Sequence, residues 1–437
     1  MKFVHCTKKE FLVKARDKNV ICFGASKQLT EALKVLQEEI EIVNKVIAVI
    51  DNDKEKSGTI IEWNHHSFKV QGIEYFNHNQ DKQAIVLITS RYYLEITKQL
   101  ELIEGWCDTD IFAYACMILD PEEEEESRYQ SRMVNQALLE YQEYLDVRNI
   151  TKTEKNKYYE KMKEYIKDRN KKVIPSIVLM HSNICTLKCE QCCDLIPDTK
   201  QKYYIPAKEV LKSAQLLLKG VDKCIRVDLT DGESFLYQEL DILLKSLIEN
   251  DKVETILLVT NATVIPEESI LKLLKNEKCF VHISDYGLLE QMSKLIILFE
   301  ANHINFSVAP NMVWRKFKFN NLEKRKEGKE WLKYEFLRCG NKKCSKPLIG
   351  NRFYGCMPAF RFANANIFES EKDYVLLKEE DTPSQIWEKI KQICMIDYIE
   401  ACQYCNFENT GLPFCRAGEQ EGLVQSNYRI VKREESK

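Results

Sequence analysis

Four cysteines lie within nine residues in the stretch HSNICTLKCEQCCDLIPD, and no other feature of the sequence is better equipped for chemistry. They are Cys185, Cys189, Cys192 and Cys193. Thiols spaced so closely can form disulfides, bind zinc or hold an iron–sulfur cluster. Composition alone predicts only about 0.03 occurrences of the C-x3-C-x2-C spacing of the first three, so chance is a weak explanation.

The composition of the whole chain argues against disulfides. Of 437 residues 17 are cysteine, and the N-terminus MKFVHCTKKEFLVKARDKN lacks the apolar run of a secretory signal. No segment approaches the ~20 apolar residues of a membrane span. We therefore predict a cytoplasmic protein, whose reducing surroundings favour metal or redox roles for clustered thiols. The net charge of −3 gives no overall attraction to nucleic acid or anionic lipid, so neither partner is expected.

Zinc and an iron–sulfur cluster make different demands on such a loop. Zinc sites usually take four ligands in paired C-x2-C knuckles, whereas only three cysteines here are regularly spaced. Three thiolates can hold three irons of a [4Fe–4S] cluster and leave the fourth iron open to a cofactor. The pattern does not need Cys193, which we interpret as structural.

Repeated strand–helix units over 173–310 are the elements that must position this loop. The apolar stretch VIPSIVLM runs directly into the cysteines, and helix and strand patterns then alternate as far as INFSVAP. Such repeats fit a full or partial barrel, whose chemistry belongs at the carboxyl ends of the strands. Polar residues stand at three of these ends, namely Asp231-Gly232-Glu233, Asn261 and Ser284.

The loop Cys185-x3-Cys189-x2-Cys192 resembles the cluster-binding loop of the radical S-adenosylmethionine (radical SAM) superfamily. The resemblance implies that the open iron binds S-adenosylmethionine. It also implies that an electron from the cluster cleaves this cofactor to a 5′-deoxyadenosyl radical. One departure lies in the loop itself, because Gln191 stands where the family often has an aromatic residue against the adenine.

The strand ends resemble further motifs of the same superfamily. Asp231-Gly232-Glu233 stands where the family has Gly-Gly-Glu, so the resemblance makes Glu233 the expected partner of the cofactor's ammonium group. Asn261, in TNAT, matches a frequent TNG motif, and Ser284 ends the next strand; both are expected to contact the cofactor. Asp231 departs from the pattern, because it replaces the first glycine of the triad and restricts the backbone there.

A second group of cysteines follows residue 336, where the strand–helix alternation stops. GNRFYGC predicts a hairpin, with Gly350 and Asn351 at its turn, and CQYC supplies a close pair of thiols. The arrangement resembles the twitch domain, the shorter relative of the SPASM domain, which holds one auxiliary [4Fe–4S] cluster with four cysteines. A zinc site made from the same thiolates is the alternative. The implied ligands are Cys339, Cys356, Cys402 and Cys405, with Cys344 as the rival of Cys339.

The remaining cysteines have other expected roles. Cys394 falls on a helical pattern and is expected in the core. Cys415 is either a packing residue or a functional thiol near the active site, and it stands with Glu233 as a candidate catalytic residue. Four scattered cysteines with apolar neighbours are expected to be small buried hydrophobes: Cys6, Cys22, Cys107 and Cys116.

The N-terminal part of the chain predicts a second α/β unit. NVICFG ends in glycine, a helical pattern follows, and the next strand ends at Asp51 and Asp53. This order resembles a Rossmann-like nucleotide-binding domain. Only Gly24 fits the G-x-G-x-x-G fingerprint, with Ser26 and Leu29 at the other two positions. A scaffold or docking role is therefore favoured over dinucleotide binding.

We therefore predict an α/β protein with an N-terminal Rossmann-like parallel sheet. A partial (β/α)6 radical SAM barrel and a small C-terminal cysteine-rich twitch/SPASM-like domain follow. The expected boundaries are 1–118 for the Rossmann-like domain, 119–170 for a charged helical linker, 171–335 for the barrel, 336–420 for the auxiliary-cluster domain and 421–437 for a tail.

The resemblance implies an enzyme with S-adenosylmethionine and two [4Fe–4S] clusters as cofactors. An external one-electron reductant such as flavodoxin or ferredoxin is expected as a partner. A closed auxiliary cluster can accept the electron that a substrate radical loses, which favours dehydrogenation of a sugar, aminocyclitol or nucleotide-linked substrate. The alternatives are radical epimerisation, with Cys415 returning hydrogen, and crosslinking of a ribosomal peptide. Peptide-modifying relatives commonly begin with a winged-helix-like domain, so the Rossmann-like N-terminus argues for the small molecule.

Overall fold

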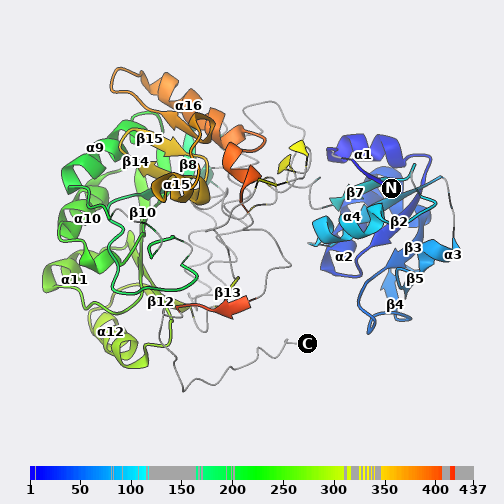
Figure 1. Ribbon diagram of the computed structural model, residues 1–437, viewed down its shortest axis with the longest axis horizontal. Helices are drawn as coiled ribbons and strands as arrows, with labels where there is room; N and C mark the ends of the chain where they lie inside the picture. The colour runs from blue at the N-terminus through cyan, green and yellow to red at the C-terminus, as the bar shows by residue number, and fades with distance from the viewer. Residues whose placement is uncertain are drawn as a thin grey trace.

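The structure is a computed structural model in which helices pack against two large sheets (Figure 1). It describes residues 1–114 apart from 5, 80, 82, 91 and 107; 117; 164, 165 and 168; 171–309 apart from 193, 198, 200 and 201; 313–315; scattered residues between 324 and 339; 346–405; and 414–418. The expected linker and tail lie almost wholly outside the described residues, and so do Cys107 and Cys116.

The N-terminal sheet has the strand order β1-β7-β6-β2-β3-β5-β4 among the described residues. Its pairs are parallel except β4–β5. The central order β5-β3-β2-β6-β7 is that of doubly wound nucleotide-binding folds, as the strand–helix alternation predicts. The strands are β1 (Lys2–Phe3), β2 (Asn19–Phe23), β3 (Val46–Ile50), β4 (Ile60–Trp63), β5 (His66–Gln71), β6 (Ala84–Ile88) and β7 (Asp110–Ala113).

Helices cover both faces of this sheet. Alternate residues of each strand point to opposite faces, and in β2 the residues on both faces are apolar and must be buried. Ile21 and Phe23 of β2 pack in one core cluster with α3 and α4. Val20 and Cys22 pack in the other with α1 and α2, and the predicted burial of Cys22 is confirmed. The helices are α1 (Lys8–Ala15), α2 (Lys27–Ile40), α3 (Tyr75–His78) and α4 (Tyr93–Glu101), with the 3-10 turn η1 (Ile42–Lys45).

The glycine turn after β2 is closed by the chain's own contacts. Gly24 has φ +120, and a Cβ there would lie 2.7 Å from the Thr89 carbonyl oxygen. The Asp51 carboxylate accepts a hydrogen bond of 2.7 Å from the Ala25 N–H. The scaffold or docking role of the N-terminal sheet stays a prediction.

The second sheet has the order β12-β11-β10-β9-β8-β14-β15-β16 among the described residues. The strands from β12 to β14 pair in parallel, which confirms the predicted α/β architecture of this part. The first five strands in the chain are β8 (Val173–Leu179), β9 (Lys223–Leu229), β10 (Val253–Thr260), β11 (Cys279–Ser284) and β12 (Phe306–Ala309).

Amphipathic helices line the outer side of this sheet (Figure 1). In the first of them, α9, buried side chains recur at helical spacing: Ala207, Val210, Ala214, Leu217 and Leu218. They meet the outward side chains of the strands in one core cluster. The helices are α9 (Ala207–Leu218), α10 (Leu240–Glu249), α11 (Glu268–Leu274) and α12 (Leu289–Ala301), with the 3-10 turn η3 (Ser234–Leu236).

The C-terminal segment continues the second sheet. The predicted hairpin is present as β14 (Pro347–Ile349) and β15 (Arg352–Tyr354), with Gly350 in the left-handed conformation at its turn. Because β14 pairs in parallel with β8, the sheet extends across the boundary expected at 336. The other elements are β16 (Tyr374–Leu376), β13 (Val313–Arg315) paired with β17 (Phe414–Arg416), α15 (Met357–Asn364), α16 (Pro383–Met395), η5 (Glu371–Asp373) and η6 (Glu400–Gln403).

Candidate cluster and cofactor site

The cysteine loop follows β8 at the carboxyl edge of the second sheet, as the sequence predicts. Cys189 is buried, whereas Cys185 and Cys192 are partly exposed. Burial raises the pKa of Cys185, and burial with the Asp194 carboxylate raises the pKa of Cys192 to about 12. Because iron binds the thiolate, these groups must lose their protons when a metal is bound. Cys193 lies outside the described residues.

The turn after β9 is packed backbone to backbone against this loop. Gly232 has φ +65, and a Cβ at this position would overlap the carbonyl oxygen of Ile184. That oxygen accepts a 2.9 Å hydrogen bond from the Glu233 N–H. Ile184 immediately precedes Cys185, so the glycine places the turn directly beside the first cysteine. The sequence alone could not reveal this approach of two backbones.

The Glu233 carboxylate is buried, at 2 % exposure, and it is held by three donors of the chain. Its Oε1 accepts hydrogen bonds from the Thr260 hydroxyl (2.7 Å) and the Phe235 N–H (3.1 Å). Its Oε2 accepts one of 2.8 Å from the Asn261 N–H. Burial raises the pKa of Glu233, and these three donors oppose the rise. In this structure Glu233 fixes the end of β10, and its contact with a cofactor stays a prediction.

Asn261 connects the end of β10 to the cysteine loop. Its amide nitrogen lies 3.5 Å from the Cys185 sulfur and donates to the Thr186 hydroxyl at 3.2 Å. Ser284 is also buried. Thr260 of β10 pairs with Ile283 of β11, so the next residues along the two chains, Asn261 and Ser284, stand at the same level of the sheet. The structure thus brings Cys185, Asn261 and the 231–233 turn together, with Ser284 on the adjoining strand end.

A buried ionic network that the sequence did not indicate lies behind the turn. Asp231 has φ +125 and is fully buried, and its carboxylate accepts hydrogen bonds from the Tyr203 hydroxyl and the Arg361 guanidinium. Arg361 also donates to Asp194 at 2.8 Å. Burial raises the pKa of Asp231 to about 6, against the lowering effect of Arg361. The only sequence signal was Asp231 itself, an acid in place of the family's glycine.

Three of the four predicted auxiliary ligands are close enough to interact. Burial raises the pKa of Cys402, and the neighbouring Cys356 and Cys405 raise it further. Cys356 precedes α15, while Cys402 and Cys405 lie in and after η6, so the hairpin and the C-x2-C pair converge. The backbone N–H of Cys339 bonds to the Phe336 carbonyl, and its role stays a prediction. Its rival Cys344 lies outside the described residues.

The chemistry of the donors fits the implied cofactors. Within the described residues, no group of three or more His, Cys, Asp or Glu side chains is arranged to hold a single metal ion. Thiolates are the ligands that iron–sulfur clusters take, one on each iron. Gln191 adds a second sign, because its buried side-chain oxygen has no hydrogen-bond partner in the described structure and suits a ligand N–H group.

Cys415 lies on β17, near the carboxyl end of β11. The Arg416 guanidinium donates to the Tyr286 carbonyl at 3.5 Å, and Gly418 packs against the Tyr286 ring. Tyr286 follows Ser284 by two residues, so β17 reaches the edge of the sheet that carries the candidate site. Cys415 is buried at 9 % exposure, and its function stays a prediction. Cys394 is buried on α16, which confirms its predicted place in the core.

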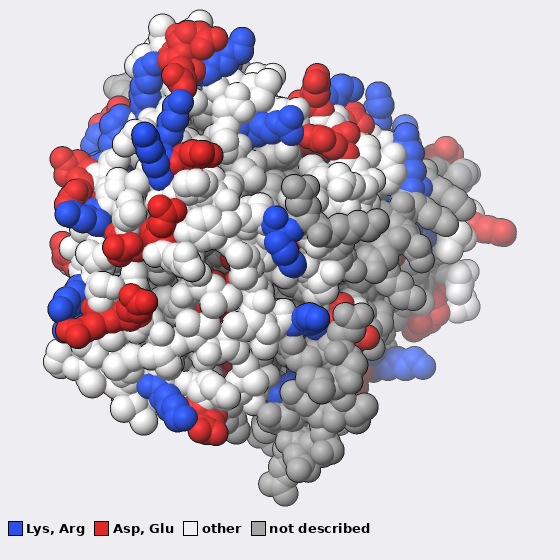
Figure 2. All heavy atoms as spheres, turned by 60° about the vertical axis from the view of Figure 1, so that its left-hand side comes forward, with Lys and Arg blue, Asp and Glu red and all other residues white. Residues whose placement is uncertain are grey.

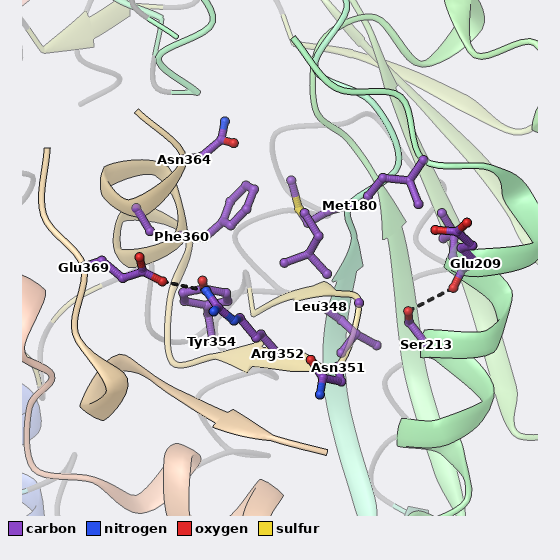
Figure 3. A pocket seen from close by; sticks show the side chains of 15 residues that line it. Met180, Glu209, Ser213, Leu348, Asn351, Arg352, Tyr354, Phe360, Asn364 and Glu369 are labelled. Atoms are coloured by element: carbon purple, nitrogen blue, oxygen red, sulfur yellow. Dashed lines mark hydrogen bonds and ion pairs between the residues drawn. The ribbon is translucent and has the colours of Figure 1, made fainter. Parts of the chain in front are cut away.

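A separate cavity of about 430 Å³ lies between α9, the β14–β15 hairpin and α15 (Figure 3). Met180 and Leu348 line its apolar part. On one side Arg352 forms an ion pair of 2.6 Å with Glu369. None of the residues that line this cavity is a predicted site residue, so it is distinct from the cysteine loop.

Solved structures that resemble this chain include radical SAM enzymes. One is anSMEcpe with bound AdoMet, at 15 % identity and a TM-score of 0.32 over 53 % of this chain and 84 % of that one. Another is Streptococcus suis SuiB bound to S-adenosylmethionine, at 15 % identity and a TM-score of 0.31 over 65 % and 88 %. A third is BtrN in an open conformation, at 13 % identity and a TM-score of 0.32 over 55 % and 94 %.

These similarities are too distant to carry an assignment, which rests on the site residues. No protein-family model matches the chain, and no curated protein matches it. Among the described helices, none combines the length and apolar character needed to cross a membrane. The face in Figure 2 shows acidic and basic side chains interspersed, without a continuous basic surface among its coloured residues.

Proposed function

We propose that the chain is a radical SAM enzyme. The observation that carries the proposal is the contact between the cysteine loop and the ends of β9 and β10, in which Asn261 reaches the Cys185 sulfur and Gly232 abuts Ile184. Residues far apart in the sequence, each matching a family motif, therefore meet at one edge of the sheet. When bound there, the cluster supplies the electron that cleaves S-adenosylmethionine to a 5′-deoxyadenosyl radical.

The residues of this edge have separate tasks in the proposal. Cys185, Cys189 and Cys192 hold three irons and leave the fourth for the cofactor. Asn261 donates toward the Cys185 sulfur and stabilises its thiolate form. Glu233 keeps Asn261 in place and offers its remaining lone pairs to the cofactor's ammonium group.

We further propose an auxiliary [4Fe–4S] cluster on Cys356, Cys402, Cys405 and Cys339. The position of Cys356 at the start of α15, with Cys402 in η6 and Cys405 just after it, supports the proposal. Bound there, the cluster would accept the electron that remains when a substrate carbon bearing a hydroxyl group loses a hydrogen atom to the cofactor-derived radical and then a proton, and so becomes a carbonyl. An external flavodoxin or ferredoxin supplies the electron for the first cluster.

A polar substrate of the sugar or aminocyclitol class is supported by the inner face of the second sheet. Val227 of β9 and Val281 of β11 point toward the helices and join the core cluster, so their strand neighbours face the interior. There Arg226 and Asp228 form a two-point ion pair with contacts of 2.5 and 2.8 Å. His282 lies 3.2 Å from the Ser307 hydroxyl. Such a lining suits a hydroxylated molecule better than an apolar one.

Epimerisation is the second candidate, favoured by the position of Cys415 near the carboxyl end of β11. In that reaction a thiol returns hydrogen to the opposite face of the substrate carbon. Peptide crosslinking is a third candidate. SuiB has been solved bound to its precursor peptide SuiA, which is a property of SuiB and is not carried over to this chain.

Iron content tests the cluster proposal. We expect about eight irons per chain after anaerobic reconstitution, from two [4Fe–4S] clusters. The triple alanine variant of Cys185, Cys189 and Cys192 should keep about four of them. Zinc in place of iron, or no iron lost in this variant, would refute the two-cluster assignment.

Product analysis in D2O separates the two small-molecule reactions. Dehydrogenation gives a product that is two electrons more oxidised and carries no deuterium at the reacting carbon. The double alanine variant of Cys402 and Cys405 should then still form 5′-deoxyadenosine while losing the oxidised product. Epimerisation gives a product of unchanged oxidation state with one deuterium, and Cys415→Ala should stall it after hydrogen abstraction.

A further inference from the structure

Arg361 joins three parts of the chain that are far apart in sequence. It lies on α15, five residues after Cys356, and its side chain is 1 % exposed. Its Nη1 donates to Asp231 Oδ1 at 2.6 Å, and its Nη2 donates to Asp194 Oδ1 at 2.8 Å. Asp194 follows Cys192 by two residues, and Asp231 directly precedes Gly232. One guanidinium therefore contacts the cysteine loop and the cofactor turn from the helix beside the auxiliary cysteines.

The burial of this network makes each charge depend on the others. Asp231 is fully buried, and a buried ion pair becomes strongly destabilising when one partner is removed. Asp231 also has φ +125, a conformation that favours glycine, so the acid is retained there against a backbone cost. The Tyr203 hydroxyl donates to its second oxygen. Both oxygens of Asp231 are thus held, and the turn that follows has little freedom.

The guanidinium group is specifically suited to this arrangement. It is planar, with several N–H donors in a fixed fork, and can hold two carboxylates at a defined angle. A lysine ammonium is a point charge on a flexible stem and would not impose that angle. The position of Asp194 relative to Asp231 is therefore set by one planar guanidinium group.

We propose that Arg361 is a positioning residue that couples the auxiliary-cluster segment to the binding of S-adenosylmethionine. Through Asp231 it fixes the Gly232-Glu233 turn, and through Asp194 it fixes the C-terminal side of the cysteine loop. The identity of the ligand rests on the proposed function, whereas the clamp is formed by described residues alone. Energetic coupling between two sites is reciprocal. An ordered auxiliary-cluster segment should therefore strengthen the binding of S-adenosylmethionine, and bound S-adenosylmethionine should in turn order that segment.

The test is a double-mutant cycle read as affinity for S-adenosylmethionine in reconstituted protein. Arg361→Met is combined with the double alanine variant of Cys402 and Cys405, which lacks the auxiliary cluster. The matched control is Arg352→Met on nearby β15. Arg352 forms an ion pair with Glu369 in which both side chains are about half exposed, and its guanidinium lies 4.8 Å from the centre of the Tyr374 ring. Arg361→Lys keeps the charge and removes the fork.

We expect Arg361→Met to weaken binding by roughly tenfold, within the usual range of coupling between sites. Arg361→Lys should recover only part of this loss, and Arg352→Met should bind like the unsubstituted protein. Loss of Cys402 and Cys405 should weaken binding in the Arg352→Met chain but add little in the Arg361→Met chain. Full affinity in Arg361→Met, or effects that multiply independently, would overturn the proposal.

Hydrogen exchange of cluster-free protein provides a readout that does not depend on the proposed function. Arg361→Met should raise exchange across 183–195 and 231–233, and Arg352→Met should not. If the single variant fails to fold, Asp231→Asn with Arg361→Met removes both buried charges and should fold while keeping the raised exchange. Absence of S-adenosylmethionine binding in the unsubstituted protein would refute the proposed function. Unchanged exchange in these variants would refute the clamp.

Discussion

Replacing Gly232 with alanine tests whether the close approach of the cofactor turn to the cysteine loop is essential. Gly232 has φ +65, and an added Cβ would overlap the backbone oxygen of Ile184, which cannot rotate away as a side chain could. Gly350 in the same sheet provides the control, because it has φ +54 and nothing lies within 4 Å of its added Cβ. Both positions require the left-handed backbone conformation, but only Gly350 has room for a side chain.

The expected costs follow from these two contributions. A left-handed conformation costs a residue other than glycine about 1 kcal/mol, so Gly350→Ala should lower the free energy of unfolding by that amount. Forcing atoms into occupied space typically adds about 1–3 kcal/mol. Gly232→Ala should therefore cost roughly 2–4 kcal/mol, unless the cysteine loop moves to relieve the overlap. Movement of that loop would appear as lost iron instead of lost stability.

Two measurements are needed, urea unfolding of cluster-free protein and iron content after reconstitution. We expect Gly232→Ala to differ from Gly350→Ala in at least one, either by about 1–3 kcal/mol of stability or by the irons of one cluster. Equal stability and equal iron in the two variants would show that the 231–233 turn and the cysteine loop are not in contact in solution. The proposed site would then lose its main support.

Two further predictions concern single side chains near the loop. Glu233→Gln replaces one acceptor oxygen by an NH2 group, which would face either the Thr260 and Phe235 donors or the Asn261 N–H. We expect affinity for S-adenosylmethionine to fall roughly tenfold with unchanged cluster spectra, and unaltered binding by calorimetry would remove Glu233 from the site. His181 is fully buried, and burial lowers its pKa from 6.5 to about 4, so the folded state binds its proton less tightly than the unfolded state. The stability that neutral His181 contributes is present above pH 6.5 and is lost as the pH falls toward 4, by about 3 kcal/mol in total. His181→Asn should flatten this part of the urea midpoint's pH dependence, and an unchanged slope would contradict the assignment.

The regular parts of the fold were predictable because their patterns are local. Continuous apolar runs indicated most of the strands from β8 to β12, and helical periodicity indicated the helices between them. The three residues of β14 carry no such pattern. Their parallel pairing with β8, far away in sequence, arises from tertiary packing and could not be read from the chain. The sheet therefore extends further than the sequence indicated.

The candidate site was predictable where chemistry fixes the residue type. Thiol spacing indicated the cysteine loop, and polar residues after apolar runs indicated Asn261 and Ser284. What Glu233 does in this structure could not be foreseen, because the Thr260 hydroxyl and the Asn261 N–H reach it only after two strands pair. Sequence patterns identify the residues at a strand end, but the partners of each side chain depend on register.

Asp231 shows how a departure from a family pattern can indicate a distant partner. A carboxylate at φ +125 is unfavourable in isolation, and a fully buried one more so. Both costs are offset here by Arg361, which stands 130 positions later in the chain. An acid in place of glycine therefore implies a buried cation somewhere in the fold, although no local pattern says which one. Exchanging Asp231 for glycine alone should give the Gly-Gly-Glu sequence and still destabilise the protein, because it would remove one of the two carboxylates that pair with the buried Arg361 guanidinium. Urea unfolding of the cluster-free variant measures this loss.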